Sequence, residues 1–245
     1  MEERKVYVKT KCFIIGTGRN GSKLLSNILA LGNNISLHGE VEKGPQPQFY
    51  KDYYDGRLKI KTVLNYWKAT REERMQGDKE IYLEKNHLIV PMLNIVNICY
   101  PESKFIFLRR NKKDTIRSFL ARGTYSEKDM AGAYGKARLQ PKEDNIYSDF
   151  WGKYNNEQKI GWLVNEYERM CLNFLIDIDT HKFITVRYEN LIDVDNRMDE
   201  VESIYRWLGI EGFDKELIGE TFGYQIGSSS DEKETGKLPN GRIRK

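Results

Sequence analysis

A glycine-rich segment near the N-terminus combines residue types that bind phosphate. It reads IIGTGRNGSKLL, with an apolar run before the glycines and a helical pattern after them. Glycines permit a tight turn and let backbone N–H groups approach an oxyanion closely. The start of the following helix adds unpaired N–H groups and the positive end of the helix dipole. Together with the charges of Arg19 and Lys23, this pattern predicts a phosphate-binding loop.

The loop differs from the phosphate loop of nucleoside triphosphatases. That loop reads G-x-x-x-x-G-K-[ST], and only the spacing of Gly16 and Gly21 fits it, because the serine here precedes the lysine. Such enzymes also need an aspartate at the end of a strand to hold magnesium. In this chain the apolar run Phe105–Leu108 ends in Arg109 and Arg110 instead. Arginines at that place suit an anion that is handled without a metal.

With two further segments, the loop resembles the sulfotransferase superfamily. Residues Gly18–Ser22 are similar to the 5′-phosphosulfate loop of that family, which reads roughly [K/R]-S-G-[S/T]-T. The stretch KFIFLRRNKKDTIRS resembles the family's 3′-phosphate motif, a strand followed by R-[N/D]-P-x-D-x-x-x-S, with Arg110 and Ser118 as the motif arginine and serine. The segment Val186–Leu191, VRYENL, looks like the family's Y-E-[D/N]-L element.

The resemblance implies a donor, a reaction and a set of binding residues. The family moves a sulfuryl group from 3′-phosphoadenosine 5′-phosphosulfate (PAPS) to a hydroxyl or amine by in-line displacement and releases the bisphosphate PAP, and no metal is implied. This chain departs from the family pattern at Asn20, Lys23 and Lys112, where serine, threonine and proline are usual. The expected donor-binding residues are Gly18, Arg19, Asn20, Gly21, Ser22, Lys23, Leu24, Arg110 and Ser118.

Candidate catalytic residues also follow predicted strands. We expect Arg19 and Lys85 to stabilise charge on the transferred group and on the leaving phosphate. The sequence KNH that ends at His87 resembles the K-T-H of cytosolic sulfotransferases, whose histidine is the base. Glu40 and Glu42 are rival bases, in a segment that looks like the catalytic G-E-E run of tyrosylprotein sulfotransferases, and transfer without a side-chain base also stays open. A glutamate base would need its pKa raised by burial to act near neutral pH, whereas a histidine would not.

The candidate residues need a scaffold that brings strand ends together. Short apolar runs alternate with helical patterns, the longest of which is Ile160–Ile178. This alternation predicts a single α/β domain with a doubly wound parallel sheet of about four to five strands. Ligands of such sheets bind beyond the C-terminal ends of the strands, and His181, before a strand, is expected at the opposite edge. The predicted strands are Lys11–Ile15, Ile81–Glu84, Lys104–Leu108 and Lys182–Val186.

Composition excludes several classes of protein. The 245 residues carry a net charge of +4 with dispersed lysines and arginines, which does not favour nucleic-acid binding. No apolar run is long enough to span a membrane, and the N-terminal residues lack the features of a signal peptide, so we expect a cytoplasmic protein. Cysteine and histidine show no metal-ligand spacing. Cys12, Cys99 and Cys171 are expected to be buried, reduced thiols.

Two stretches show no clear period. Residues 123–156 are rich in glycine and tyrosine and are predicted to be either a binding loop or disordered. Their aromatic side chains either contact an acceptor or pack in the core, and the acceptor itself stays open among small molecules, carbohydrates and peptides. Residues 227–245 are expected to be a flexible polar tail after a domain of residues 1–226. The sequence does not predict an oligomeric state.

Two other functions stay open. A P-loop nucleotide-dependent kinase could share this fold, and a magnesium requirement would identify it. A module that binds PAP or another nucleotide without turnover is the non-enzyme alternative. Lys85 and His87 argue against the second alternative, because a binding module has no need of them.

Overall fold

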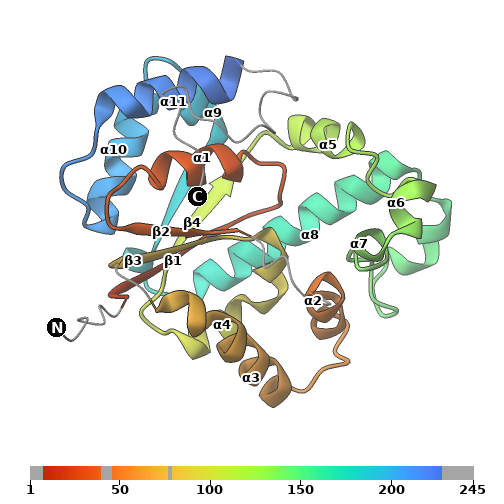
Figure 1. The fold of residues 1–245 in the computed structure, drawn as a ribbon. Helices are drawn as coiled ribbons and strands as arrows, with labels where there is room; N and C mark the ends of the chain where they lie inside the picture. The colour runs from red at the N-terminus through yellow and green to blue at the C-terminus, as the bar shows by residue number, and fades with distance from the viewer. Residues whose placement is uncertain (1–7, 40–45, 77–78, 228–245) are drawn as a thin grey trace.

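A parallel β-sheet forms the centre of the structure, a computed structural model that describes residues 8–39, 46–76 and 79–227. The sheet has five strands in the order β2-β3-β1-β4-β5, and all neighbouring strands pair in parallel (Figure 1). This arrangement confirms the predicted doubly wound α/β fold. The strands are β1 (Thr10–Ile15), β2 (Ile35–His38), β3 (Ile81–Lys85), β4 (Lys104–Arg109) and β5 (Phe183–Arg187).

Four strands fall within one residue of the predicted runs, whereas β2 was not predicted. It has four residues, ISLH, of which only Ile35 is buried. A short strand at the edge of a sheet, with one face to solvent, leaves little apolar signal in the sequence.

Helices cover both faces of the sheet (Figure 1). Successive residues of a strand point to opposite faces, so Phe13 and Ile15 pack on one helical layer and Cys12 and Ile14 on the other. The first layer contains α2 (Gln46–Tyr54), α3 (Ile60–Arg71), α4 (Leu93–Cys99) and α8 (Asn156–Ile176). The second contains α1 (Ser22–Leu29), α9 (Tyr188–Ile192), α10 (Arg197–Leu208) and α11 (Lys215–Gly227).

The C-terminal edge of the sheet brings the candidate residues together. β1 continues into the glycine loop and α1, and β5 continues into α9. β3 leads to the short helix η2 (His87–Met92), and β4 leads to α5 (Lys112–Leu120). β1 lies at the centre, where the chain passes from the β2–β3 side of the sheet to the β4–β5 side. A topological switch point of this kind is the usual ligand crevice of open α/β sheets.

The irregular stretch of residues 123–156 forms two short helices, α6 (Glu127–Ala131) and α7 (Ala133–Lys136), and the 3-10 helix η3 (Ser148–Lys153). Tyr125 and Trp151 pack edge to face at 5.6 Å, and the Tyr125 hydroxyl donates to the carbonyl of Leu139 at 2.6 Å. These two aromatic residues therefore serve packing. Two 3-10 turns, η1 (Glu73–Met75) and η4 (Thr180–Lys182), complete the described elements.

Among the helices in the described ranges, none is both long and apolar enough to cross a bilayer. The predicted tail lies outside the described residues, apart from Gly227 at the end of α11.

Candidate active site

Left-handed backbone conformations shape the glycine loop. The φ angles of Gly16, Gly18, Arg19 and Gly21 are 146°, 74°, 53° and 91°. Only glycine adopts most of these angles at little cost, which explains the spacing of the three glycines. Gly21 is the N-cap of α1 and its position has no side-chain capping bond. The amides of the first turn of α1 can therefore serve an anion.

Asn20 ties the loop to the neighbouring strand. Its Nδ2 donates to the carbonyl of Leu108 at the end of β4, at 2.7 Å, and the side chain is buried. A Cβ on Gly16 would lie 2.3 Å from that Nδ2 and 2.5 Å from the Leu108 carbonyl oxygen. The asparagine that replaces the family's serine thus has a structural role for its side chain, and glycine is needed at position 16 to let it pass.

Arg19, Arg110 and Ser118 come together. Arg19 Nε donates to Ser118 Oγ at 3.1 Å, and Arg110 Nη1 donates to the Arg19 carbonyl at 3.1 Å. Burial, followed by the nearby charges of Arg122 and Arg110, lowers the pKa of the Arg19 guanidinium. An anion bound here would relieve this repulsion. The predicted 5′ and 3′ phosphate motifs are therefore one continuous cationic site.

The segment after β5 braces both motifs. The Arg110 guanidinium lies 4.5 Å from the centre of the Tyr188 ring, a cation–π contact. A Cβ on Gly21 would lie only 2.1 Å from Tyr188 Cδ2, so the ring packs directly on the glycine loop. Glu189 Oε1 accepts a hydrogen bond from the backbone N–H of Asn111 at 2.7 Å, which holds the turn between β4 and α5.

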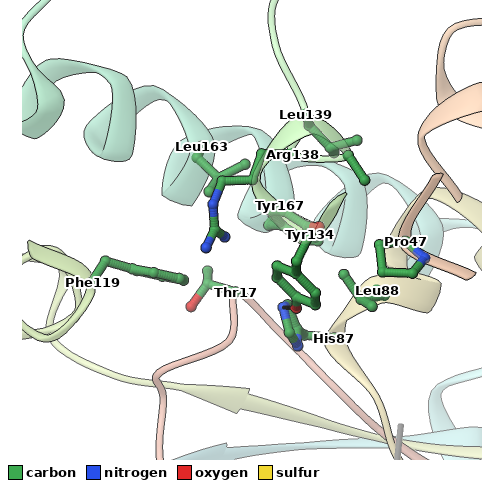
Figure 2. A pocket seen from close by; sticks show the side chains of 11 residues that line it. Thr17, Pro47, His87, Leu88, Phe119, Tyr134, Arg138, Leu139, Leu163 and Tyr167 are labelled. Atoms are coloured by element: carbon green, nitrogen blue, oxygen red, sulfur yellow. Dashed lines mark hydrogen bonds between the residues drawn. The ribbon is translucent and has the colours of Figure 1, made fainter. Parts of the chain in front are cut away.

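Lys85 ends the strand beside β1, and His87 packs on the glycine loop. Lys85 ends β3 opposite Ile14 of β1, and His87 begins η2. A Cβ on Gly18 would lie 2.9 Å from His87 Cδ2, so the imidazole packs against the loop. His87 Nε2 lies 3.3 Å from the hydroxyl oxygen of Tyr134 in α7, and Figure 2 shows the two rings next to each other. The space beside this imidazole therefore admits an O–H group.

These two rings line a small, mostly apolar pocket (Figure 2). The glycine loop contributes Thr17, and helix α8 contributes Leu163 and Tyr167. Phe119 comes from α5, and Arg138 from the segment after α7. Segments that follow β1, β3 and β4 thus converge with α8 on one place.

The structure describes the other two histidines but not the rival glutamate bases. Glu40 and Glu42 lie outside the described residues. His181 lies in η4, just before β5, at the opposite edge of the sheet as expected. His38 ends β2, where it stacks on Tyr82 with ring centres 4.5 Å apart, and burial is the first cause that lowers its pKa.

The remaining predicted donor-binding residues lie together at the start of α1. Ser22, Lys23 and Leu24 form the first turn of α1. The Leu24 side chain lies in the core, so only its backbone can face a ligand. Arg109, the other arginine after β4, donates from Nε to Glu168 of α8 at 2.9 Å and is engaged there.

Sequence reasoning did not anticipate the place of Tyr134 at the active edge. This tyrosine belongs to a stretch without periodicity, and its neighbour His87 is 47 positions away in the chain. The sequence signal was only a cluster of aromatic residues, which did not distinguish Tyr134 from the packing residues Tyr125 and Trp151.

A family model described as a sulfotransferase domain matches residues 9–220. The chain belongs to the sulfotransferase family. The matched range of this sulfotransferase contains the glycine loop, the Arg110–Ser118 segment and the segment after β5. Family membership also makes the chain a transferase. No curated protein sequence matches the chain.

Solved sulfotransferase structures share the fold. A sulfotransferase domain from the curacin biosynthetic pathway is 14% identical, with a TM-score of 0.57 over 93% of this chain and 83% of that one. A sulfotransferase from Mycobacterium tuberculosis H37Rv is 15% identical, with a TM-score of 0.53 over 94% and 76% of the two chains. One from Alicyclobacillus acidocaldarius is 11% identical, with a TM-score of 0.53 over 92% and 99%.

Proposed function

We propose that this sulfotransferase takes its sulfuryl group from PAPS. The observation that carries the proposal is the arrangement of Arg110. Its side chain lies within the cationic site and its buried Nε has no hydrogen-bond partner among the described residues. A buried guanidinium N–H without a partner is costly, and a phosphate oxygen would satisfy it. PAPS supplies a second phosphate, at its 3′ position, in addition to the one that the glycine loop would bind.

The residues present also fit the transfer step. The acceptor oxygen or nitrogen forms a bond to sulfur, the bond from sulfur to the bridging phosphate oxygen breaks, and PAP leaves. Backbone amides of the loop, with Arg19 and Lys85, would stabilise the charge on the sulfuryl group and on the leaving phosphate. His87 would take the proton of the acceptor, and the hydroxyl of Tyr134 marks where such an acceptor group can stand, 3.3 Å from Nε2.

The donor is tested by PAP release. Purified protein is supplied with PAPS and a panel of phenols, sugars and amines, and PAP is measured by chromatography. We expect acceptor-dependent PAP release that EDTA does not change. Adenosine 5′-phosphosulfate should replace PAPS poorly. Phosphate transfer from magnesium ATP would instead identify a kinase, and tight PAP binding without turnover on any acceptor would identify a binding module.

The base is tested by substitution. His87→Asn should lower kcat by at least about 100-fold with PAP affinity nearly unchanged, since a positioned general base contributes about 10²- to 10⁴-fold. His181→Asn is the matched control, because that histidine lies at the opposite edge of the sheet, and it should retain full activity. If His87→Asn keeps most of its activity while Glu40→Gln or Glu42→Gln abolishes it, a glutamate is the base.

The acceptor and the location complete the proposal. We propose a hydroxyl or amine of a small molecule, carbohydrate or peptide as the acceptor.

A cytoplasmic location is supported by the free thiols of Cys12, Cys99 and Cys171, of which Cys12 and Cys171 are buried. The mass of the intact protein after treatment with an alkylating reagent, first native and then unfolded, would check that all three thiols are reduced.

A further inference from the structure

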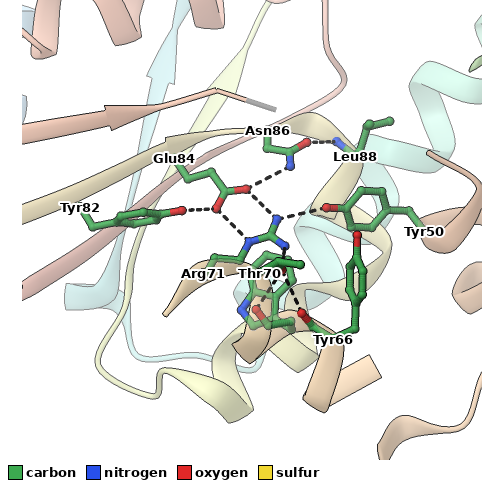
Figure 3. Close-up of polar contacts among 9 residues, drawn as sticks. Tyr50, Tyr66, Thr70, Arg71, Tyr82, Glu84, Asn86 and Leu88 are labelled. Carbon is green, nitrogen blue, oxygen red and sulfur yellow. Dashed lines mark hydrogen bonds and ion pairs between the residues drawn. The ribbon is translucent and has the colours of Figure 1, made fainter. Parts of the chain in front are cut away.

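A fully buried ion pair lies directly beneath the end of β3. Arg71 of α3 and Glu84 of β3 are both 0% exposed. Arg71 Nη2 donates to Glu84 Oε1 at 2.9 Å, and Arg71 Nε donates to Oε2 at 3.2 Å (Figure 3). The guanidinium also stacks on the ring of Trp67, 3.7 Å from its centre. The pair therefore links the helix α3 to the strand that carries Lys85.

Further hydrogen bonds complete this polar cluster. The Tyr82 hydroxyl donates to Glu84 Oε2 at 2.7 Å, and Arg71 Nη2 donates to the Tyr50 hydroxyl at 3.1 Å. Burial alone would raise the pKa of the Glu84 carboxyl, but the charge of Arg71 and the hydrogen bonds hold it below its ordinary value. The pair thus stays ionised inside the core.

Stability alone is a weak reason for such a cluster. The desolvation of two charges offsets much of their attraction, and apolar residues of the same volume are often as stable. A geometrically defined polar cluster does fix its surroundings in one arrangement. Such a cluster therefore points to a neighbouring group whose position matters.

Asn86 connects the ion pair to the start of η2. Its Nδ2 donates to Glu84 Oε1 at 3.0 Å, and its Oδ1 accepts from the backbone N–H of Leu88 at 3.0 Å. The side chain is 1% exposed. These two bonds lie on either side of His87, the first residue of the helix that Asn86 caps. Both the position and the direction of the His87 backbone thus depend on Glu84.

Lys85 is fixed by the same anchor. Side chains alternate between the two faces of a strand, so an anchored Glu84 directs Lys85 to the opposite face. The strand register agrees, because Lys85 lies opposite Ile14, which packs on the layer that contains α1. A rotation of the strand end would move Lys85 and His87 together.

We propose that Glu84 and Asn86, held in place by Arg71, are positioning residues that set Lys85 at the end of β3 and His87 against the glycine loop. The part of this inference that concerns turnover rests on the proposed function. The part that concerns the placement of His87 does not, since it can be measured without a donor.

The first test compares two substitutions in the cluster. Asn86→Ala removes the connection from Glu84 Oε1 to η2. Tyr82→Phe removes a hydrogen bond of similar length to the other carboxylate oxygen, Glu84 Oε2. A displacement of about 1 Å costs up to about 100-fold in rate, so we expect Asn86→Ala to lower kcat by about 10- to 100-fold. The Kd of Asn86→Ala for PAP should stay within about twofold of the wild-type value, because only the orientation of His87 and Lys85 is lost.

The control separates positioning from stability. Tyr82→Phe should lower Tm about as much as Asn86→Ala and yet keep kcat within about twofold, since its effect on orientation is small. Asn86→Thr, whose hydroxyl can accept the Leu88 N–H as a helix cap, should recover part of the lost kcat. Equal losses of kcat in Asn86→Ala and Tyr82→Phe would show that the cluster only stabilises the fold.

The second test uses the protein without donor. Ring signals of the three histidines are assigned in proton–carbon NMR spectra with single His→Gln variants. Asn86→Ala should shift or broaden the signals of His87, whereas Tyr82→Phe should shift those of His38, on which Tyr82 stacks. Unchanged His87 signals in Asn86→Ala would overturn the inference. If the wild-type protein has no sulfotransferase activity, the proposed function fails while this result still decides the placement of His87.

Discussion

Arg110 is held in place before any ligand arrives. It contacts the Arg19 carbonyl at 3.1 Å and the face of Tyr188 at 4.5 Å, measured to the ring centre. A guanidinium that is already oriented loses little conformational freedom when it binds phosphate. Binding energy at this residue should therefore depend on the 3′-phosphate of the ligand and little on the rest of the nucleotide.

We accordingly expect Arg110→Ala to weaken PAP binding by about one to two decades, since a hydrogen bond to a charged group contributes about 1.5–3 kcal/mol. Calorimetric titrations with PAP and with adenosine 5′-monophosphate measure this effect, and only the PAP affinity should fall. Arg117→Ala is the control, because that arginine is exposed on α5 and pairs with Asp114. Equal affinity of the wild type for both ligands would place the 3′-phosphate elsewhere.

Lys85 and Arg19 should respond differently to substitution. Lys85→Ala is expected to lower kcat by about 10²- to 10³-fold with little change in the Kd of PAP, since PAP lacks the sulfuryl group that this cation would stabilise. Arg19→Ala should affect both quantities, because its Nε contacts Ser118 of the 3′-phosphate motif. Steady-state kinetics at saturating PAPS, together with PAP titrations, separate the two. A Lys85→Ala variant that loses PAP affinity but keeps kcat would move Lys85 to a phosphate-binding role.

The sequence predicted which residues lie at the strand ends, but it did not predict their mutual contacts. Gly18, Arg110 and Ser118 could be placed by motif and spacing. The contact of Arg19 with Ser118 joins residues 99 positions apart, and the anchoring of Asn20 to Leu108 joins residues 88 apart. Such pairings depend on how the strands assemble, and no local pattern in the chain records them.

At the scale of elements, the three central strands and the edge strand β5 were predicted, whereas the edge strand β2 and the short helices α6 and α7 were not. β1 and β4 each have four consecutive buried residues, which read as continuous apolar runs. The helices α6 and α7 have five and four residues, too few for a 3.6-residue period to be visible. Tertiary contacts such as the pair of Asp129 with Arg138 stabilise this segment instead.

The start of α1 depends on a glycine for two separate reasons. Gly21 has a φ of 91°, and a Cβ there would lie 2.1 Å from the Tyr188 ring. Gly21→Ala should therefore displace Tyr188 or the loop, lower Tm by several degrees and weaken PAP binding by at least about tenfold. Thermal unfolding and calorimetric titration measure the two effects.

Gly209 provides the matched control for this prediction. It also has a positive φ, of 80°, at the end of α10, but a Cβ there would have nothing within 4 Å. Gly209→Ala should therefore lower Tm through backbone strain alone and leave PAP affinity unchanged. If both variants bind PAP as tightly as the wild type, the contact between Tyr188 and the loop does not shape the donor site.

For the whole molecule, the described carboxylates that are paired with arginine determine how stability responds to acid. Hydrogen bonds from Arg138 are the first cause that lowers the pKa of Asp129, with a further contribution from the backbone N–H of Tyr125. Burial would raise the pKa of Glu166, but hydrogen bonds from Arg169 and Tyr54 lower it. The Glu84 carboxyl, ion-paired with Arg71, behaves in the same way. The pair of Arg71 with Glu84 connects α3 to β3. The Tyr54 hydroxyl connects α2 to Glu166 of α8, so the loss of these contacts should affect global unfolding.

The direction of the pH effect follows from the sign of these shifts. A carboxyl whose folded-state pKa lies below its unfolded value, about 4 for aspartate, adds stability above that value. This stability is lost as the pH falls through the folded-state pKa. The free energy of unfolding in urea should therefore be higher for the wild type than for Asp129→Asn at pH 7, and the difference should shrink below about pH 4. Asp114→Asn, which alters an exposed ion pair with Arg117, should differ little from the wild type at any pH. A difference between the wild type and Asp129→Asn that is as large at pH 3 as at pH 7 would show that the variant acts through packing and not through the charge of Asp129.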